Sequence, residues 1–184
     1  MRFVLVFLVL FSSPLQAQEL LPEYQVLGYI DLVMDSEERR FPIIAMPKQD
    51  RSFANKYELH REDGIYKIRL SGITPGKDGH WDFPMISVDI TTHENEMFRS
   101  IYISYATEFF RDDYNFSAST RDQSAFYGEL VEDENGLVEF DFRGKLTHYD
   151  VDPDTRESTP QEGKAAVEIT GHVSVTIPAE YREE

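Results

Sequence analysis

Apolar and polar residues alternate along most of this chain with a period of two, rather than the 3.6 of a helix. In the clearest run, Val138, Phe140 and Phe142 alternate with charged residues. The stretch 167–177 alternates in the same way, with valine and isoleucine at most of its apolar positions. This pattern predicts half-buried antiparallel strands, each with one face in the core and one face in water.

Turn-forming residues separate the alternating runs. Acidic residues with serine, asparagine or glycine gather at 35–38, 62–64 and 133–136, where hairpin turns are expected. Only 107–114 has a weak helical signal. We predict a single all-β domain of about nine strands. The strands that the pattern bounds best are 25–34, 39–46, 54–61, 65–71, 124–132, 137–149 and 164–177.

Several glycines fall on the apolar phase of the expected strands, where glycine marks a bend, a bulge or close packing. If the turn at Asp133 is a three-residue loop, Phe126 lies opposite Gly144 and Phe142 lies opposite Gly128. Each ring would then cover a glycine on the next strand, as happens in strongly coiled sheets. We therefore predict a strongly curved antiparallel β-barrel or β-sandwich.

The amino terminus has the pattern of a secretory signal peptide. Met1-Arg2 is followed by the apolar run Phe3–Phe11 and then by a short polar stretch that ends at Ala17. The apolar run is too short for a membrane span, which needs about 20 residues. We expect residues 1–17 to be removed, which leaves 18–184 as the β-domain.

Composition narrows the compartment and the partners. The chain has no cysteine, so an exported protein of this kind relies on core packing alone and fits a bacterial periplasm or secretion. The formal net charge of −16 disfavours nucleic acid and anionic lipid as partners. It favours cationic partners or divalent metals. A run of charged residues at 139, 141, 143 and 145 also argues against a membrane-facing barrel wall.

One loop carries alternating carboxylates. Asp150, Asp152 and Asp154 could converge oxygen ligands on Ca²⁺. The loop does not follow the helix-flanked calcium pattern, because Thr155 stands at its glycine position and Gln161 at its final glutamate position. A calcium site here is a hypothesis, and no other cofactor is expected.

The sequence holds no motif for catalysis. No two histidines have the spacing of metal ligands, and no nucleophile motif such as Gly-x-Ser-x-Gly is present. A hydrolase therefore ranks third among the functions considered, and the sequence favours a binding domain over an enzyme.

Aromatic residues offer a candidate contact surface. Trp81 lies in the glycine-containing loop 72–84 and is the best single candidate for a binding hot spot. Other aromatic residues lie off the core phase or in a loop, where they can contact sugars, lipids or proteins. These are Tyr102, Phe109, Phe110, Tyr114 and Tyr127.

Two binding functions remain open. The first is an exported interaction module that binds a protein or an envelope polymer. The alternative is a small-molecule or lipid carrier with a lipocalin-like barrel, although Gly28-Tyr29-Ile30 stands where such barrels carry Gly-x-Trp. A carrier needs an empty interior, whereas Phe140 and Phe142 are large enough to fill one, so we favour the interaction module.

Overall fold

The computed structural model describes residues 20–93, 99–108, 115–152, 155 and 158–182. The predicted signal peptide and the segment 109–114 lie outside these residues. The described part is all-β, as predicted, and its strands join into one antiparallel sheet. Its helices are short 3-10 turns, and none is long and apolar enough to cross a membrane.

The sheet has thirteen strands in the described residues instead of about nine. The difference comes from short strands. The predicted strand 124–132 divides in two, and β3, β8 and β12 lie in segments where no strand was expected. The strands are β1 (Gln25–Met34), β2 (Glu37–Met46), β3 (Arg51–Ser52), β4 (Ala54–His60), β5 (Ile65–Pro75), β6 (Trp81–His93), β7 (Arg99–Ala106), β8 (Asn115–Ser119), β9 (Ala125–Tyr127), β10 (Val131–Glu132), β11 (Leu137–Val151), β12 (Ser158–Pro160) and β13 (Val167–Thr176). The 3-10 turns are η1 (Pro47–Gln49), η2 (Arg61–Asp63) and η4 (Ala179–Tyr181).

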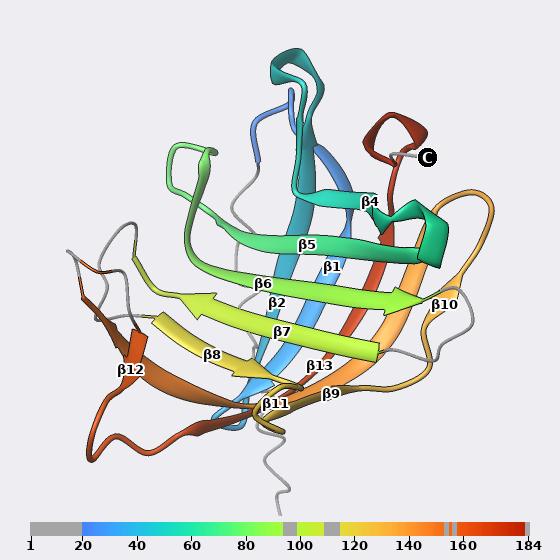
Figure 1. The fold of residues 1–184 in the computed structure, drawn as a ribbon. Helices are drawn as coiled ribbons and strands as arrows, with labels where there is room; N and C mark the ends of the chain where they lie inside the picture. Colours follow the sequence, from blue (N-terminus) through green and yellow to red (C-terminus); the bar gives the residue numbers. More distant parts are fainter. Residues whose placement is uncertain (1–19, 94–98, 109–114, 153–154, 156–157, 183–184) are drawn as a thin grey trace, which may run out of the picture.

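The sheet curls so that its two halves face each other. In Figure 1, β5, β6 and β7 cross steeply in front of β1, β2 and β13. The strand order is β3-β2-β1-β13-β11-β8-β7-β6-β5-β4, and β9, β10 and β12 also pair with β11. The long strand β11 joins the halves, because its first part pairs with β13 and its last part with β8.

The core lies between the two halves and contains the apolar phase that the alternation predicts. Val138, Phe140 and Phe142 of β11 are buried, as are Ile103 of β7 and Val173 of β13. The paired strands β11 and β13 run antiparallel from Leu137↔Thr176 to Leu146↔Val167, which confirms the predicted pairing. The charged phase of β11 therefore faces outward.

The chain between β3 and β4 ties the two halves together. The Phe53 N–H donates to the carbonyl of Ile44 on β2 (2.9 Å), and the Phe53 carbonyl accepts from Ser71 N–H on β5 (2.7 Å). One residue thus bonds to β2 and to β5, which lie near opposite ends of the strand order.

The predicted register of Phe126 and Phe142 is wrong. The pairing of β10 with β11, Val131 with Glu139 and Glu132 with Val138, is the one expected for a three-residue loop at Asp133. However, Phe126 of β9 pairs with Arg143 rather than with Gly144. An extra residue lies between β9 and β10, which is a β-bulge and shifts the register by one. Phe126 therefore points outward. Phe142 instead pairs with Gly171 and packs over it, so the expected ring-over-glycine contact forms with a different glycine.

Candidate functional site

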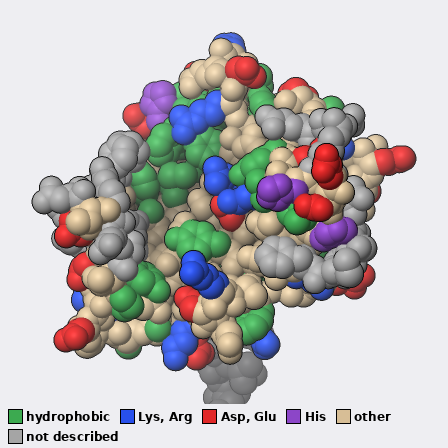
Figure 2. Space-filling model, viewed as in Figure 1, with side chains coloured by type: hydrophobic (Ala, Val, Ile, Leu, Met, Phe, Trp, Pro, Cys, Tyr) green, Lys and Arg blue, Asp and Glu red, His purple; other side chains and the backbone are tan. Residues whose placement is uncertain are grey.

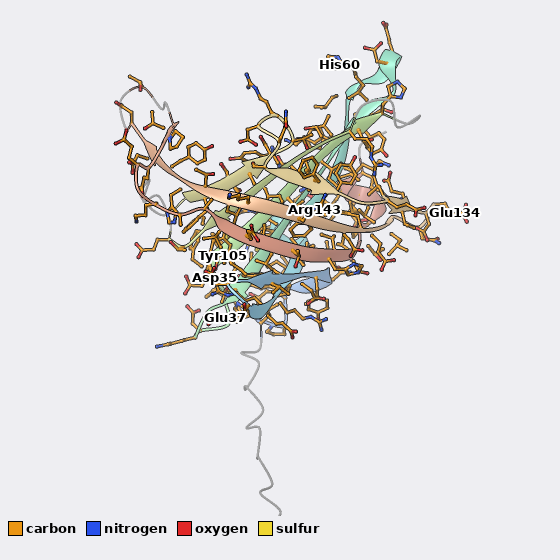
Figure 3. The ribbon with its side chains drawn as sticks, turned by 90° about the horizontal axis from the view of Figure 1, so that it is seen from below. Asp35, Glu37, His60, Tyr105, Glu134 and Arg143 are labelled. Carbon is orange, nitrogen blue, oxygen red and sulfur yellow. The ribbon has the colours of Figure 1, made fainter. Side chains whose placement is uncertain are left out.

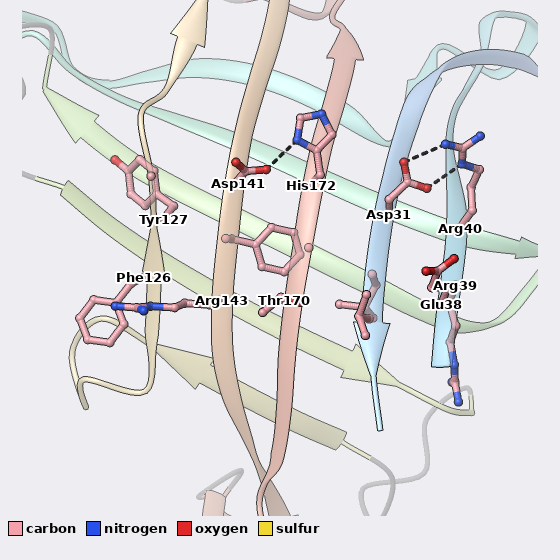
Figure 4. A pocket seen from close by; sticks show the side chains of 15 residues that line it. Asp31, Glu38, Arg39, Arg40, Phe126, Tyr127, Asp141, Arg143, Thr170 and His172 are labelled. Carbon is pink, nitrogen blue, oxygen red and sulfur yellow. Dashed lines mark hydrogen bonds and ion pairs between the residues drawn. The ribbon is translucent and has the colours of Figure 1, made fainter. Parts of the chain in front are cut away.

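A groove of about 1000 Å³ crosses the outer face of the half that contains β1, β2, β9, β11 and β13. Neighbouring strands pair in register here, so outward side chains form rows that run across the strands. Two such rows line the groove, and Figure 4 shows them from outside the sheet. We call the first the ion row (Arg40, Asp31, His172 and Asp141) and the second the open row (Glu38, Val33, Thr170, Arg143 and Phe126).

The ion row pairs its charges internally. Arg40 donates two hydrogen bonds to Asp31, from Nε (2.6 Å) and Nη2 (2.9 Å). These bonds hold the pKa of Asp31 below its usual value, against a smaller opposing effect of burial. The row therefore leaves the Arg40 and Asp31 charges satisfied.

His172 lies between two carboxylates of β11. Its Nδ1 is 2.8 Å from Oδ1 of Asp141, and its Nε2 is 3.2 Å from Oε1 of Glu139. Only a protonated ring donates from both nitrogens, so these contacts are both favourable when His172 is an imidazolium. The position of His172 on the outer phase of its strand agrees with the alternation pattern.

The open row carries charges without partners. The Arg143 guanidinium lies over the ring of Phe126, 5.5 Å from its centroid. Within the described part of the chain, neither Arg143 nor Glu38 has an ion-pair partner. Val33 and Thr170 are smaller and lie between these two charged residues in the row. An apolar and hydroxyl-bearing stretch thus separates an open cation from an open anion (Figure 4).

A second arginine that lines the groove, Arg39, points toward the core instead. Arg39 donates to the Tyr105 hydroxyl (2.6 Å) and to Glu37 (2.9 Å). Figure 3 places Tyr105 near Asp35 and Glu37, at the end of the β1–β2 hairpin, with Arg143 farther along β11. Arg39 is therefore engaged within the fold, while Arg143 is open to a ligand.

The outer face of the other half is different in chemistry. Five hydroxyl residues lie in one row across β5, β6, β7, β8 and β11, and we call this the hydroxyl row. Beside it, Asp89 forms ion pairs with Lys67 (2.5 Å) and Arg69 (3.3 Å). Figure 2 looks onto this face and shows basic side chains beside acidic ones near its centre. The hydroxyl row consists of Ser71, Ser87, Ser104, Ser117 and Thr147.

The described members of the predicted aromatic surface lie on different parts of the fold. Tyr102 is 47% exposed on the outer face of β7, next to Asp89 and Ser119. Tyr127 faces inward because of the bulge, and its ring lies 6.0 Å from that of Phe140. Phe126 is exposed in its place, at 44%. Phe109, Phe110 and Tyr114 lie outside the described residues.

Trp81 begins β6 and packs within an aromatic cluster. Its ring centroid is 5.9 Å from that of Phe53 and 6.1 Å from that of Phe83. The Arg51 guanidinium lies 5.8 Å from the Trp81 ring. Trp81 is only partly buried, so its predicted role in binding stays a prediction, and it lies on a different part of the fold from the groove.

The acidic segment is only partly described, and it starts within a strand rather than in a loop, because Asp150 belongs to β11 and pairs with Thr159 of β12. Asp150 accepts a hydrogen bond from the side chain of Gln161, and Asp152 accepts one from the Thr155 N–H (2.8 Å). Asp154 lies outside the described residues. Among the residues that the structure describes, no group of three or more histidines and carboxylates could hold a metal ion. Calcium binding stays a hypothesis.

The sequence could not single out Phe126 and Arg143. The sequence pattern alone assigns Phe126 to the buried face of its strand, and only the bulge shows that it faces outward. Arg143 is one of several charged residues on one face of β11. The alternation does show which residues of β11 and β13 face water. The exposed face of these strands could therefore be predicted, but the groove on it could not.

Comparison with known proteins adds no family assignment. No family model matches the chain, and no curated protein or solved structure matches it either.

Proposed function

We propose that this chain is an exported, non-enzymatic interaction module that binds a protein partner through the groove. The observation that carries the proposal is the open row, in which an exposed aromatic ring and two unpaired charges line a hollow of about 1000 Å³. Exposed groups of this kind on a rigid sheet are typical of contact surfaces.

A protein partner fits the groove better than an envelope polymer. The open row offers both an acid, Glu38, and a base, Arg143, and proteins carry both signs of charge. The net charge of −16 also repels anionic polymers at long range. Crosslinking of Phe126 to a polysaccharide, in the experiment below, would contradict this choice of partner.

A lipid or small-molecule carrier has less support. A cluster of buried apolar side chains fills the space between the two halves of the sheet. The groove and a smaller hollow beside it, lined by Tyr29, Glu139 and Ser174 among others, both lie on the outer face. An apolar cargo would need an interior site, so the carrier ranks below the interaction module.

The curled sheet acts, in this proposal, as a barrel-like scaffold that holds the groove rigid. Contacts of two residues support this. Phe53 bonds to both β2 and β5, and Glu132 of β10 binds Lys56 of β4 (2.7 Å) and the Tyr66 hydroxyl of β5. Strands at distant positions in the sheet order are thereby joined.

A hydrolase, the third function considered, has one observation in its favour, because the groove contains a histidine–carboxylate pair. Asp141 contacts Nδ1 of His172, as a carboxylate orients a catalytic histidine. However, a general base needs a free second nitrogen, and Nε2 of His172 contacts Glu139 instead. An activity screen of the secreted chain and its His172→Gln variant tests this candidate.

Photo-crosslinking tests the proposed function. A photoreactive phenylalanine analogue replaces Phe126 in one variant and Tyr102 in another, in cells that naturally produce the protein. The two positions have nearly equal exposure, 44% and 47%, but lie on opposite halves of the sheet. We expect a discrete protein adduct at Phe126 and none at Tyr102. A polysaccharide adduct, equal labelling at both positions or no adduct at all contradicts the proposal. The mass of the secreted chain tests cleavage after Ala17.

A further inference from the structure

We propose that the groove binds an extended peptide segment that lies across the strands and carries an acidic residue at one end and a basic residue at the other. The acidic residue contacts Arg143, and the basic residue contacts Glu38. This inference rests on the proposed function and specifies the chemistry of the partner.

The Arg143 end is prepared for a carboxylate. The guanidinium is planar and presents its donors as a fork that fits a carboxylate. Stacking on Phe126 limits the positions that the guanidinium can take, so less conformational freedom is lost on binding. Thr170 of β13 lies beside Arg143 of β11 and can add a hydroxyl contact.

The Glu38 end carries the opposite charge. Glu38 is exposed near the start of β2, and it pairs with Val33 of β1. Arg40, the nearest cation on the same face of β2, is already bound to Asp31 by two hydrogen bonds. The carboxylate of Glu38 is therefore available to a cationic group of a ligand.

The separation of the two ends sets the length of the peptide. Glu38 lies on β2 and Arg143 on β11, which are three strand spacings apart in the sheet order. At about 4.8 Å per spacing this is roughly 14 Å. An extended chain covers that distance in about four residues, at roughly 3.4 Å each. The side chains between the two charges would lie over Val33 and Thr170, which favours small or branched apolar residues there.

The rest of this face does not compete for the same ligand charges. The ion row runs parallel to the open row, and its residues already contact one another, Arg40 with Asp31 and His172 with Asp141. A ligand with adjacent charges, or with two charges of one sign, would leave an open charge of the groove unmatched. Charge spacing therefore selects the ligand.

Chemical-shift mapping with four short peptides tests the inference. The isotope-labelled secreted chain is titrated with the blocked peptide Glu-Ala-Val-Ala-Lys, and with versions that carry two glutamates, two lysines or adjacent charges. We expect shifts at Val33, Thr170 and Arg143 with the first peptide, and binding about fivefold tighter than with each of the others. Equal binding by any of the other peptides overturns the inference.

Matched variants identify the two contacts. Arg143→Gln and Glu38→Gln should each weaken the first peptide by about fivefold, whereas Arg143→Lys should weaken it less. Lys145→Gln and Glu168→Gln are the controls, because these residues lie on the same outer face just beyond the groove lining. Equal effects of the controls overturn the inference, and the amide spectrum of each variant shows that it is folded.

The two proposals fail in different ways. If Phe126 crosslinks to a protein but all four peptides bind equally or not at all, the groove is an interaction site and the charge-spacing inference is wrong. If Phe126 captures no protein, the proposed function is wrong, whatever the peptides do.

Discussion

The two outer faces of this sheet are built in the same way and yet differ in what they leave open. On the face of β5–β8, Asp89 is only 14% exposed and holds both Lys67 and Arg69. On the groove face, Asp141 is 82% exposed, and Arg143 and Glu38 have no ion-pair partner in the described residues. The cluster on the β5–β8 face pairs its own charges, whereas the groove face pairs those of its ion row and leaves Arg143 and Glu38 open. The capacity to bind follows from unsatisfied groups around a hollow, rather than from the number of polar residues.

The largest expected effect on stability comes from a substitution at Gly171, which lies beneath the groove. Gly171 has no room for a side chain, because an added Cβ would overlap the Phe142 ring and lie 2.8 Å from the Asp31 carbonyl. We expect Gly171→Ala to lower the free energy of unfolding by about 1–3 kcal/mol, measured by urea denaturation. Gly128→Ala is the control, because its Cβ would meet only the Asp141 carbonyl at 3.7 Å. Equal losses would show that the Phe142–Gly171 contact does not support this face.

The ion pairs of the two faces should differ in their effect on stability. Asp89→Asn leaves Lys67 and Arg69 without their carboxylate, and we expect a loss of about 1 kcal/mol. Asp141→Asn removes a contact that water already screens, and we expect less than about 0.5 kcal/mol. Thermal and urea unfolding of both variants measure the difference. A larger loss for Asp141→Asn would reverse the comparison.

The smallest effect is a pH dependence confined to the ion row. The Arg40 hydrogen bonds lower the pKa of Asp31 in the folded chain, so its ionised form is favoured by folding. This contribution is complete above the usual pKa of about 4 and is lost as the pH falls through the lower folded value. The stability difference between the natural chain and Asp31→Asn should therefore shrink as the pH falls below about 4. A difference that stays constant with pH would contradict the assignment.

Much of the fold could be predicted from the sequence, because burial on one face imposes a period of two. The bounds of β1 and the pairing of β11 with β13 follow directly from that alternation. The short strands could not be predicted, because β3 and β10 each contain only two residues and carry no periodic signal.

The groove could not be predicted, because it depends on register between strands that are far apart in sequence. The bulge between β9 and β10 exchanges the roles of Phe126 and Tyr127, and no local pattern shows it. Glu38 and Arg143 belong to the same row only through the pairing of β1, β2, β11 and β13. The loop around Trp81 is visible in the sequence, but its contacts with the rings of Phe53 and Phe83 are visible only in the structure.

Oxidative footprinting of side chains tests the central claim most directly, because it needs no variant and no knowledge of the partner. The rate of modification of Phe126 and of Tyr102 is measured in the isolated chain and in intact cells that produce it. The ratio of the two rates at each residue cancels the different reactivities of the rings. We predict that Phe126 reacts several times more slowly in cells while Tyr102 is unchanged. Protection of Tyr102 alone, or of neither residue, would show that the groove is not the face that binds.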